Sequence, residues 1–129
     1  MRKLRSDITR EGLARTPHRA FMRAMGLDDA AIQKPMIGVV SMKGEQTPCN
    51  MTHGFQVEAA KEGVAEAGGT PREFTTISVS DGISMNHEGM KFSLVSRELI
   101  ADSIEGSCTG LPMTGSSALA AATRPCRAS

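Results

Sequence analysis

The chain has 129 residues, of which 40% are hydrophobic and 22% are charged, and a chain of this length builds one domain around one core. Its 15 basic and 14 acidic residues give a formal net charge of +1, so no basic surface favours a nucleic-acid partner. No apolar run approaches the roughly 20 residues that span a bilayer, and the opening MRKLRSDITREGL lacks the apolar segment of a signal peptide. We therefore expect a cytoplasmic protein with no nucleic-acid and no membrane partner.

The first third of the chain carries helix signals followed by a strand signal. SDITREGLARTPHRAFMRAMG opens with the capping residues Ser6 and Asp7 and ends at Gly26, and Pro17 is expected to divide it into two short helices. PMIGVVS at 35–41 is a short apolar run rich in β-branched residues, which predicts a buried strand.

The next elements complete a strand, helix, strand unit. Residues 55–67 carry apolar side chains at helical spacing and end at the stop signal GGTP, residues 68–71. FTTISVS at 74–80 alternates as a second strand. Two strands joined by a helix with short connections predict a right-handed βαβ unit on a parallel sheet, so the expected fold class is α/β. Residues 93–105 return to a helical period.

Polar segments follow both predicted strands. SMKGEQTPCNMTH follows the first strand and carries Cys49, and SDGISMNHEGMK follows the second and carries Asp81, His87 and Glu88. In open α/β sheets, ligands bind beyond the carboxyl ends of parallel strands, because the loops converge there. Cys49 and Asp81 are therefore expected to be neighbours at one edge of the sheet.

Each of these residues also has a plain structural interpretation. A lone cysteine is more often a small buried hydrophobe than a ligand, although Cys49 follows the stiff Pro48 and lies near a helix start that favours a thiolate. Asp81 before Gly82 is a common turn or helix-cap pair. No second histidine stands four residues beyond His87 and no C-x-x-C occurs, so we exclude zincin, zinc-ribbon and thioredoxin-type sites.

Two long segments of the chain resemble a known enzyme family. RSDITREGLARTPHRAFMRAMGL and the run from TPCNMTHGF through SDGISMNHEGMKFSLVSRELIADSIE are similar to the amino-terminal part of the dihydroxy-acid dehydratases, whose superfamily also holds sugar-acid and phosphogluconate dehydratases. The resemblance covers Leu4 to Glu105. It implies an α/β/α domain of a hydro-lyase in valine and isoleucine biosynthesis, which converts 2,3-dihydroxy-3-methyl acids to 2-keto acids.

The same resemblance implies two cofactor ligands. Cys49 matches the cysteine of the PCN segment that binds the family's iron-sulfur cluster, and Asp81 matches the aspartate of the SDGIS segment that binds Mg²⁺. Soft thiolate suits iron and hard carboxylate suits magnesium. A 2Fe-2S cluster is favoured over a 4Fe-4S cluster. No catalytic residue is assigned within this chain, and His87, Glu88 and Lys91 are given no role beyond support within their loop. The intact family enzyme is expected to be a homo-oligomer that binds a small dihydroxy acid.

The sequence after Glu105 departs from the family pattern. It reads GSCTGLPMTGSSALAAATRPCRAS, is rich in small residues, has no acidic residue, and lacks the Cys-Asp-Lys segment that supplies further cluster and magnesium ligands in the family. We expect residues 1–105 to be a truncated amino-terminal dehydratase domain and 106–129 to be an unrelated, unstructured low-complexity tail. Neither Cys108 nor Cys126 is expected to replace the missing cysteine.

Two questions about function stay open at the level of sequence. The chain alone is expected to be an inactive form of a dihydroxy-acid dehydratase, because most cluster, metal and base residues of the family would lie outside it. The alternatives are a piece of a sugar-acid dehydratase and a non-catalytic remnant with at most a binding role.

Overall fold

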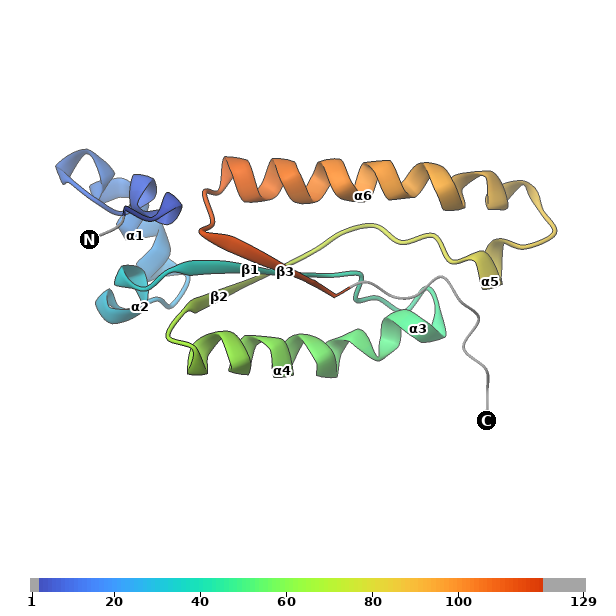
Figure 1. Ribbon diagram of the computed structural model, residues 1–129, viewed down its shortest axis with the longest axis horizontal. Coiled ribbons are helices and arrows are strands. Elements are labelled where there is room, and N and C mark those ends of the chain that lie inside the picture. The colour runs from blue at the N-terminus through green and yellow to red at the C-terminus, as the bar shows by residue number, and fades with distance from the viewer. Residues whose placement is uncertain (1–2, 120–129) are drawn as a thin grey trace.

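The structure is a computed structural model that describes residues 3–119, and these residues build an α/β architecture in three layers. The middle layer is a parallel sheet in the order β2-β1-β3, made of β1 (Met36–Ser41), β2 (Thr70–Thr75) and β3 (Gly115–Leu119). Figure 1 shows one long helix along each face of this sheet, α4 (His53–Glu66) on one side and α6 (Lys91–Gly110) on the other. The expected α/β class with a parallel sheet is confirmed.

The amino-terminal residues form short helices that precede the sheet. They are the 3₁₀ helices η1 (Arg5–Thr9) and η2 (Leu13–Arg15) and the α-helices α1 (Thr16–Ala24) and α2 (Asp29–Gln33). Pro17 lies in the first turn of α1, where its missing N–H would have no helical partner in any case. The expected division into two helices at Pro17 is wrong: the segment forms three short helices, and the non-helical break lies at residues 10–12, where Gly12 has a left-handed φ of 85°. Asp28 caps α2 by accepting a hydrogen bond of 2.7 Å from the Ala31 N–H.

The first strand and the helix after it lie where the sequence predicts them. β1 is the central strand, and five of its six residues are buried, which explains why an almost unbroken apolar run forms it. The helix expected at 55–67 is α4, which begins two residues earlier. Val39 on β1 and Val57 on α4 are both fully buried, and a smaller core of Met22, Ile32 and Met36 joins the amino-terminal helices to the sheet.

The second strand differs from its predicted bounds. The expected strand at 74–80 is wrong, because β2 begins at Thr70 and ends at Thr75. Gly68 has a left-handed φ of 82° and the Gly69 N–H bonds to the Val64 carbonyl at 2.9 Å, so the turn after α4 is complete at Gly69 and pairing starts at once. Pro71 is tolerated within β2 because this is an edge strand.

The region after Glu105 also differs from expectation. α6 continues to Gly110, and β3 then pairs in parallel with β1 from Ile37↔Gly115 to Ser41↔Leu119. The expectation of a tail without secondary structure is therefore wrong for residues 106–119. β3 consists mainly of small residues, and such residues suffice because the strand is largely exposed at the edge of the sheet. Its backbone pairs with β1 on the side away from β2. The rest of the expected tail, residues 120–129, lies outside the described residues.

Candidate functional site

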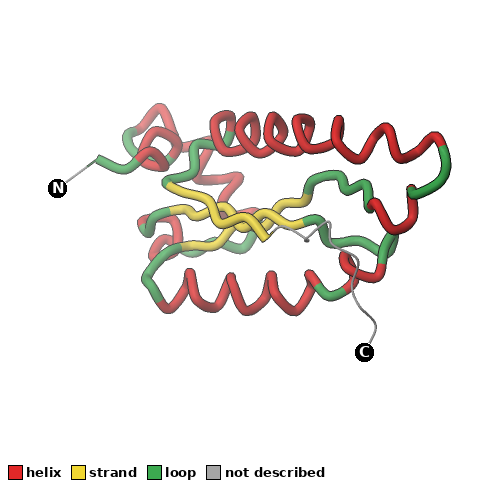
Figure 2. The backbone as a smooth tube through the Cα atoms, turned by 45° about the vertical axis from the view of Figure 1, so that its right-hand side comes forward, coloured by secondary structure: helices red, strands yellow, loops and turns green. Residues whose placement is uncertain are grey.

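The carboxyl ends of the strands define one end of the molecule. β1 leads through residues 42–47 to α3 (Pro48–Met51), and β2 leads through residues 76–80 to α5 (Asp81–Ser84). Figures 1 and 2 show α3 and α5 at the same end of the sheet in both views. The structure thus brings the two elements that carry the predicted ligands Cys49 and Asp81 to one end, because both strands run in parallel.

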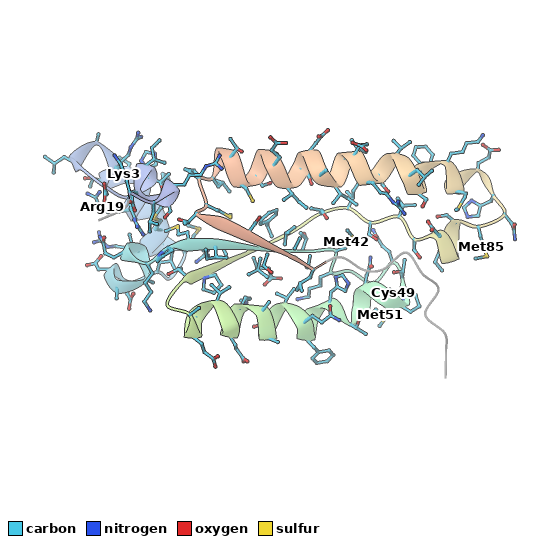
Figure 3. The ribbon with its side chains drawn as sticks, in the orientation of Figure 1. Lys3, Arg19, Met42, Cys49, Met51 and Met85 are labelled. Atoms are coloured by element: carbon cyan, nitrogen blue, oxygen red, sulfur yellow. The ribbon has the colours of Figure 1, made fainter. Side chains whose placement is uncertain are left out.

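Cys49 is the second residue of α3 and is half-buried. Figure 3 shows Cys49 at this end of the molecule, the same end as Met85, which directly follows α5. Two buried polar atoms flank the cysteine, Oγ1 of Thr47 and Nδ2 of Asn50, and neither has a hydrogen-bond partner among the described residues. Buried polar groups are usually paired, so the segment around Cys49 keeps hydrogen-bonding capacity that the described residues do not use.

A buried histidine anchors the loop that leads to Cys49. His53, the first residue of α4, is 2% exposed, and its Nδ1 accepts a hydrogen bond of 3.4 Å from the Met42 N–H just after β1. The contact joins the beginning and the end of the loop, so it helps to set where α3 begins. The sequence does not indicate a role for His53, because its partner is a backbone group eleven residues away and no local motif marks it.

Asp81 begins α5 and is joined by a hydrogen bond to α6. Its carboxylate is half-buried, and Oδ1 accepts a hydrogen bond from the hydroxyl of Ser93. Ser93 is the third residue of α6 and is 3% exposed. A buried serine on a long helix therefore holds the aspartate of a single-turn helix, a link that sequence analysis missed because the two residues are twelve positions apart.

The loop between α5 and α6 is stabilised by its own histidine. His87 Nδ1 accepts a hydrogen bond of 3.0 Å from the Gly89 N–H, so Nε2 carries the ring proton and donates to the Ile83 carbonyl at 3.0 Å. Glu88 forms an exposed ion pair with Lys91 at the start of α6. These three side chains therefore make their contacts within the loop or with its flanks, and both ring nitrogens of His87 are used there.

The donor chemistry of Cys49 and Asp81 suits the two groups that the family resemblance implies, with one of these residues for each group. Cys49 offers a soft sulfur and Asp81 a hard carboxylate oxygen, the preferences of iron and of Mg²⁺. Within residues 3–119, no three His, Cys, Asp or Glu side chains come together as a metal site.

The second described cysteine lies at the other end of the molecule. α6 runs from the α5 end back toward the amino-terminal helices (Figure 1), and Cys108 follows Ser93 by fifteen residues on it. At 1.5 Å per residue this separation is roughly 22 Å. Cys108 is therefore placed away from Cys49, and the expectation that it does not replace a cluster ligand stays a prediction. Cys126 lies outside the described residues.

Comparison with known proteins identifies the family. A model of the dihydroxy-acid/6-phosphogluconate dehydratase N-terminal family matches residues 34–121, a range that includes Cys49, Asp81 and all three strands and that extends past Glu105. The chain belongs to this family.

Curated relatives are similar over most of the chain. Dihydroxy-acid dehydratase 3 of Bradyrhizobium diazoefficiens is 81% identical over 111 residues, which are 86% of this chain and 19% of that relative. Dihydroxy-acid dehydratase 2 of Bordetella bronchiseptica is 59% identical over 105 residues, 81% of this chain and 18% of that relative. The dihydroxy-acid dehydratase of Acidothermus cellulolyticus is 58% identical over 103 residues, 80% and 18% respectively. The chain thus spans about a fifth of the length of the curated relatives it matches.

No helix in the described part of the chain is both long and apolar enough to cross a membrane.

Proposed function

We propose that this chain supplies the amino-terminal part of a dihydroxy-acid dehydratase site, which removes water from a 2,3-dihydroxy-3-methyl acid to give a 2-keto acid. The observation that carries the proposal is the placement of α3 and α5, with Cys49 and Asp81, at the carboxyl ends of neighbouring parallel strands. The identity of 81% to a dihydroxy-acid dehydratase supports it. The proposal includes what the family resemblance implies, namely a place in branched-chain amino-acid synthesis and a homo-oligomeric holoenzyme in the cytoplasm.

In this proposal the chain contributes one ligand to each of two cofactors. The Cys49 sulfur would hold an iron of a 2Fe-2S cluster, and the Asp81 carboxylate would hold Mg²⁺. When bound, the two groups supply Lewis acids that assist the departing hydroxyl and bind the substrate's oxygens. The chain's own part is to fix these donors: α3 presents Cys49 next to the His53 contact, and Ser93 holds Asp81.

A sugar-acid dehydratase is the second candidate. The matched family model covers 6-phosphogluconate dehydratases as well as dihydroxy-acid dehydratases, so the ligands alone do not select the substrate. The curated relatives named above are all dihydroxy-acid dehydratases, which favours the branched-chain substrate.

A chimeric enzyme tests this function. The matching 111 residues of the Bradyrhizobium relative are replaced by those of this chain, and formation of 2-ketoisovalerate from 2,3-dihydroxyisovalerate is measured after reconstitution with iron, sulfide and Mg²⁺. We expect turnover by the chimera, its loss in Cys49→Ala and in Asp81→Asn, and its retention in the control Cys108→Ala. The 129-residue chain alone is expected to show no turnover, because no three His, Cys, Asp or Glu side chains of its described part come together to hold a metal.

Three results would each contradict one part of this proposal. Full activity of the Cys49→Ala chimera would remove the cluster role of Cys49. Turnover of a sugar acid without turnover of dihydroxyisovalerate would favour the second candidate. Turnover by the 129-residue chain that Cys49→Ala abolishes would show that the chain completes a site by itself.

A further inference from the structure

We propose that Ser93 is the positioning residue for Asp81: its hydroxyl fixes the carboxylate so that the remaining oxygen lone pairs are presented to Mg²⁺. This inference rests on the proposed function, because that function makes Asp81 a magnesium ligand. It adds a residue on a different element to the site, one that does not itself bind the metal.

The contact has the chemistry that such a role needs. A serine hydroxyl has one proton to donate, and an ionised carboxylate only accepts, so the bond between Ser93 Oγ and Asp81 Oδ1 has a fixed direction. Ser93 is 3% exposed, so water competes little for this proton. A carboxylate has two oxygens with about four lone-pair sites, so one bond from a hydroxyl leaves the group able to bind a cation.

The lengths of the two helices explain why the fixing group comes from α6. α5 has four residues, and a single turn is too short to be stable by itself. α6 has 20 residues, a length at which a helix is far less marginal than a single turn. Ser93 lies in the first turn of α6 and Asp81 is the first residue of α5. Their hydrogen bond therefore fixes the start of α5 relative to α6.

A neighbouring serine provides the matched comparison. Ser96 lies on the same helix and is 4% exposed, but its hydroxyl donates to the Ser93 carbonyl at 3.0 Å within the helix. Removing either hydroxyl therefore deletes one hydrogen bond from a buried serine on α6. Of these two bonds, only that of Ser93 reaches Asp81, so a metal-binding effect specific to Ser93 cannot come from the general loss of a buried hydroxyl.

No three His, Cys, Asp or Glu side chains of the described residues could hold a metal together, so Mg²⁺ binding to the 129-residue chain is expected to be weak. The change in that weak binding between variants tests the proposal without any assay of activity. Titration with Mg²⁺ alone is followed by NMR at the carboxyl carbon of Asp81 and at the amides of α5. We expect Ser93→Ala to weaken the apparent affinity roughly tenfold or more, as loss of a group that orients a ligand does. Ser93→Thr should restore most of it, because the hydroxyl is kept, and Ser96→Ala should titrate as the parent chain does. Before any metal is added, the Asp81 carboxyl resonance should shift in Ser93→Ala and stay unchanged in Ser96→Ala.

Asp81→Asn separates this proposal from the proposed function. If Asp81→Asn abolishes the response of α5 to Mg²⁺ and Ser93→Ala leaves it unchanged, Asp81 is a ligand and the positioning role is wrong. Equal weakening by Ser93→Ala and Ser96→Ala would also overturn it, because the effect would then be one of helix packing. If Asp81→Asn leaves the response unchanged, the assignment of Asp81 as ligand fails, and the Ser93 proposal fails with it.

Discussion

Asp7 and Arg10 form the one ion pair in the described part of the chain in which both side chains are buried, at 8% and 5% exposure. The Arg10 guanidinium also donates to the backbone carbonyls of Ile32, at 2.9 Å, and of Lys34. A buried charge is tolerated only when it is paired and hydrogen-bonded, and these bonds meet that condition while joining η1 to the end of α2. The pair therefore fastens the amino-terminal segment to the start of β1.

This pair predicts a loss of stability in acid. The Leu4 N–H, which donates to the carboxylate at 2.7 Å, and then Arg10 hold the pKa of Asp7 below its usual value of 3.8. A depressed folded-state pKa adds stability above 3.8, and that stability disappears as the pH falls through the folded-state pKa. We expect the urea midpoint to drop below about pH 3.8, with a shallower drop in Asp7→Asn.

Asp29 supplies the control for this measurement. It pairs with Arg23, but the two side chains are 77% and 55% exposed, and exposed pairs contribute little. Asp29→Asn should therefore keep the acid dependence of the parent chain. Identical pH profiles for Asp7→Asn and the parent chain would contradict the prediction.

The candidate site shows which residues a sequence can indicate and which it cannot. Cys49 and Asp81 lie in local segments with a recognisable pattern, so the sequence alone indicates them as candidate ligands. Their roles as ligands remain predictions. Ser93 and His53 act through partners twelve and eleven positions away, and such contacts exist only once the helices have packed. No spacing rule in the sequence marks them.

At the scale of elements, Gly38 lies in the middle of β1, where the neighbouring side chains leave little room for a Cβ. A Cβ added there would lie 2.5 Å from Met113 Sδ and 3.2 Å from Phe74 Cε1. Overpacking costs about 1–3 kcal/mol, whereas the gain from a stiffer unfolded chain is about 0.4–1 kcal/mol. We therefore expect Gly38→Ala to lower the free energy of unfolding by about 1 kcal/mol in urea titrations.

Gly115 on the adjacent strand gives a matched control. It pairs with Ile37, and an added Cβ would lie 3.7 Å from Ile37 Cδ1, an ordinary contact. Gly115→Ala should therefore be neutral or stabilise the chain by up to about 1 kcal/mol. Destabilisation of the same size by both substitutions would show that packing against Met113 is not the cause.

β3 makes a second prediction at this scale. Its residues pair with β1. By contrast, residues 77–80, which alternate in sequence like a strand, extend beyond the sheet, and the last bond to β1 is that of the Thr76 N–H to the Ser41 carbonyl at 3.0 Å. Amides in a paired strand exchange more slowly than amides in an unpaired segment. Hydrogen exchange followed by mass spectrometry should therefore show stronger protection for the amides of 115–119 than for those of 77–80. The reverse order would contradict the pairing of β3.

The predictability of each element follows from the force that forms it. β1 and α4 are recognisable because burial imposes an apolar pattern on their sequences. The strand predicted at 74–80 begins later than β2, because the turn after α4 already ends at Gly69 and Pro71 is tolerated in an edge strand. β3, GSSAL, has no apolar pattern to find, since pairing with β1 through the backbone is what forms it.

At the scale of the whole molecule, the described residues leave many large apolar side chains exposed. Several lie in the first half of α6, namely Phe92, Leu94, Val95 and Leu99. The buried side of this helix carries the small residues Ser93 and Ser96 instead. Soluble monomers rarely expose contiguous apolar patches beyond a few hundred Å², so this helix is expected to be the main site of self-association of the 129-residue chain.

The stripe formed by Phe92, Val95 and Leu99 is the part of α6 to alter, because its spacing of three and four residues places these side chains along one line of the helix. Sedimentation velocity over a concentration series should show association that Phe92→Glu and Leu99→Glu each reduce. Both side chains are more than half exposed, at 63% and 53%, so either change should alter the free energy of unfolding by no more than about 0.5 kcal/mol. Phe55 on α4 is 84% exposed on the opposite face, and Phe55→Glu should leave association unchanged if α6 is the surface involved. An equal reduction by Phe55→Glu would show that exposed aromatic area in general, and not this stripe, drives the contact.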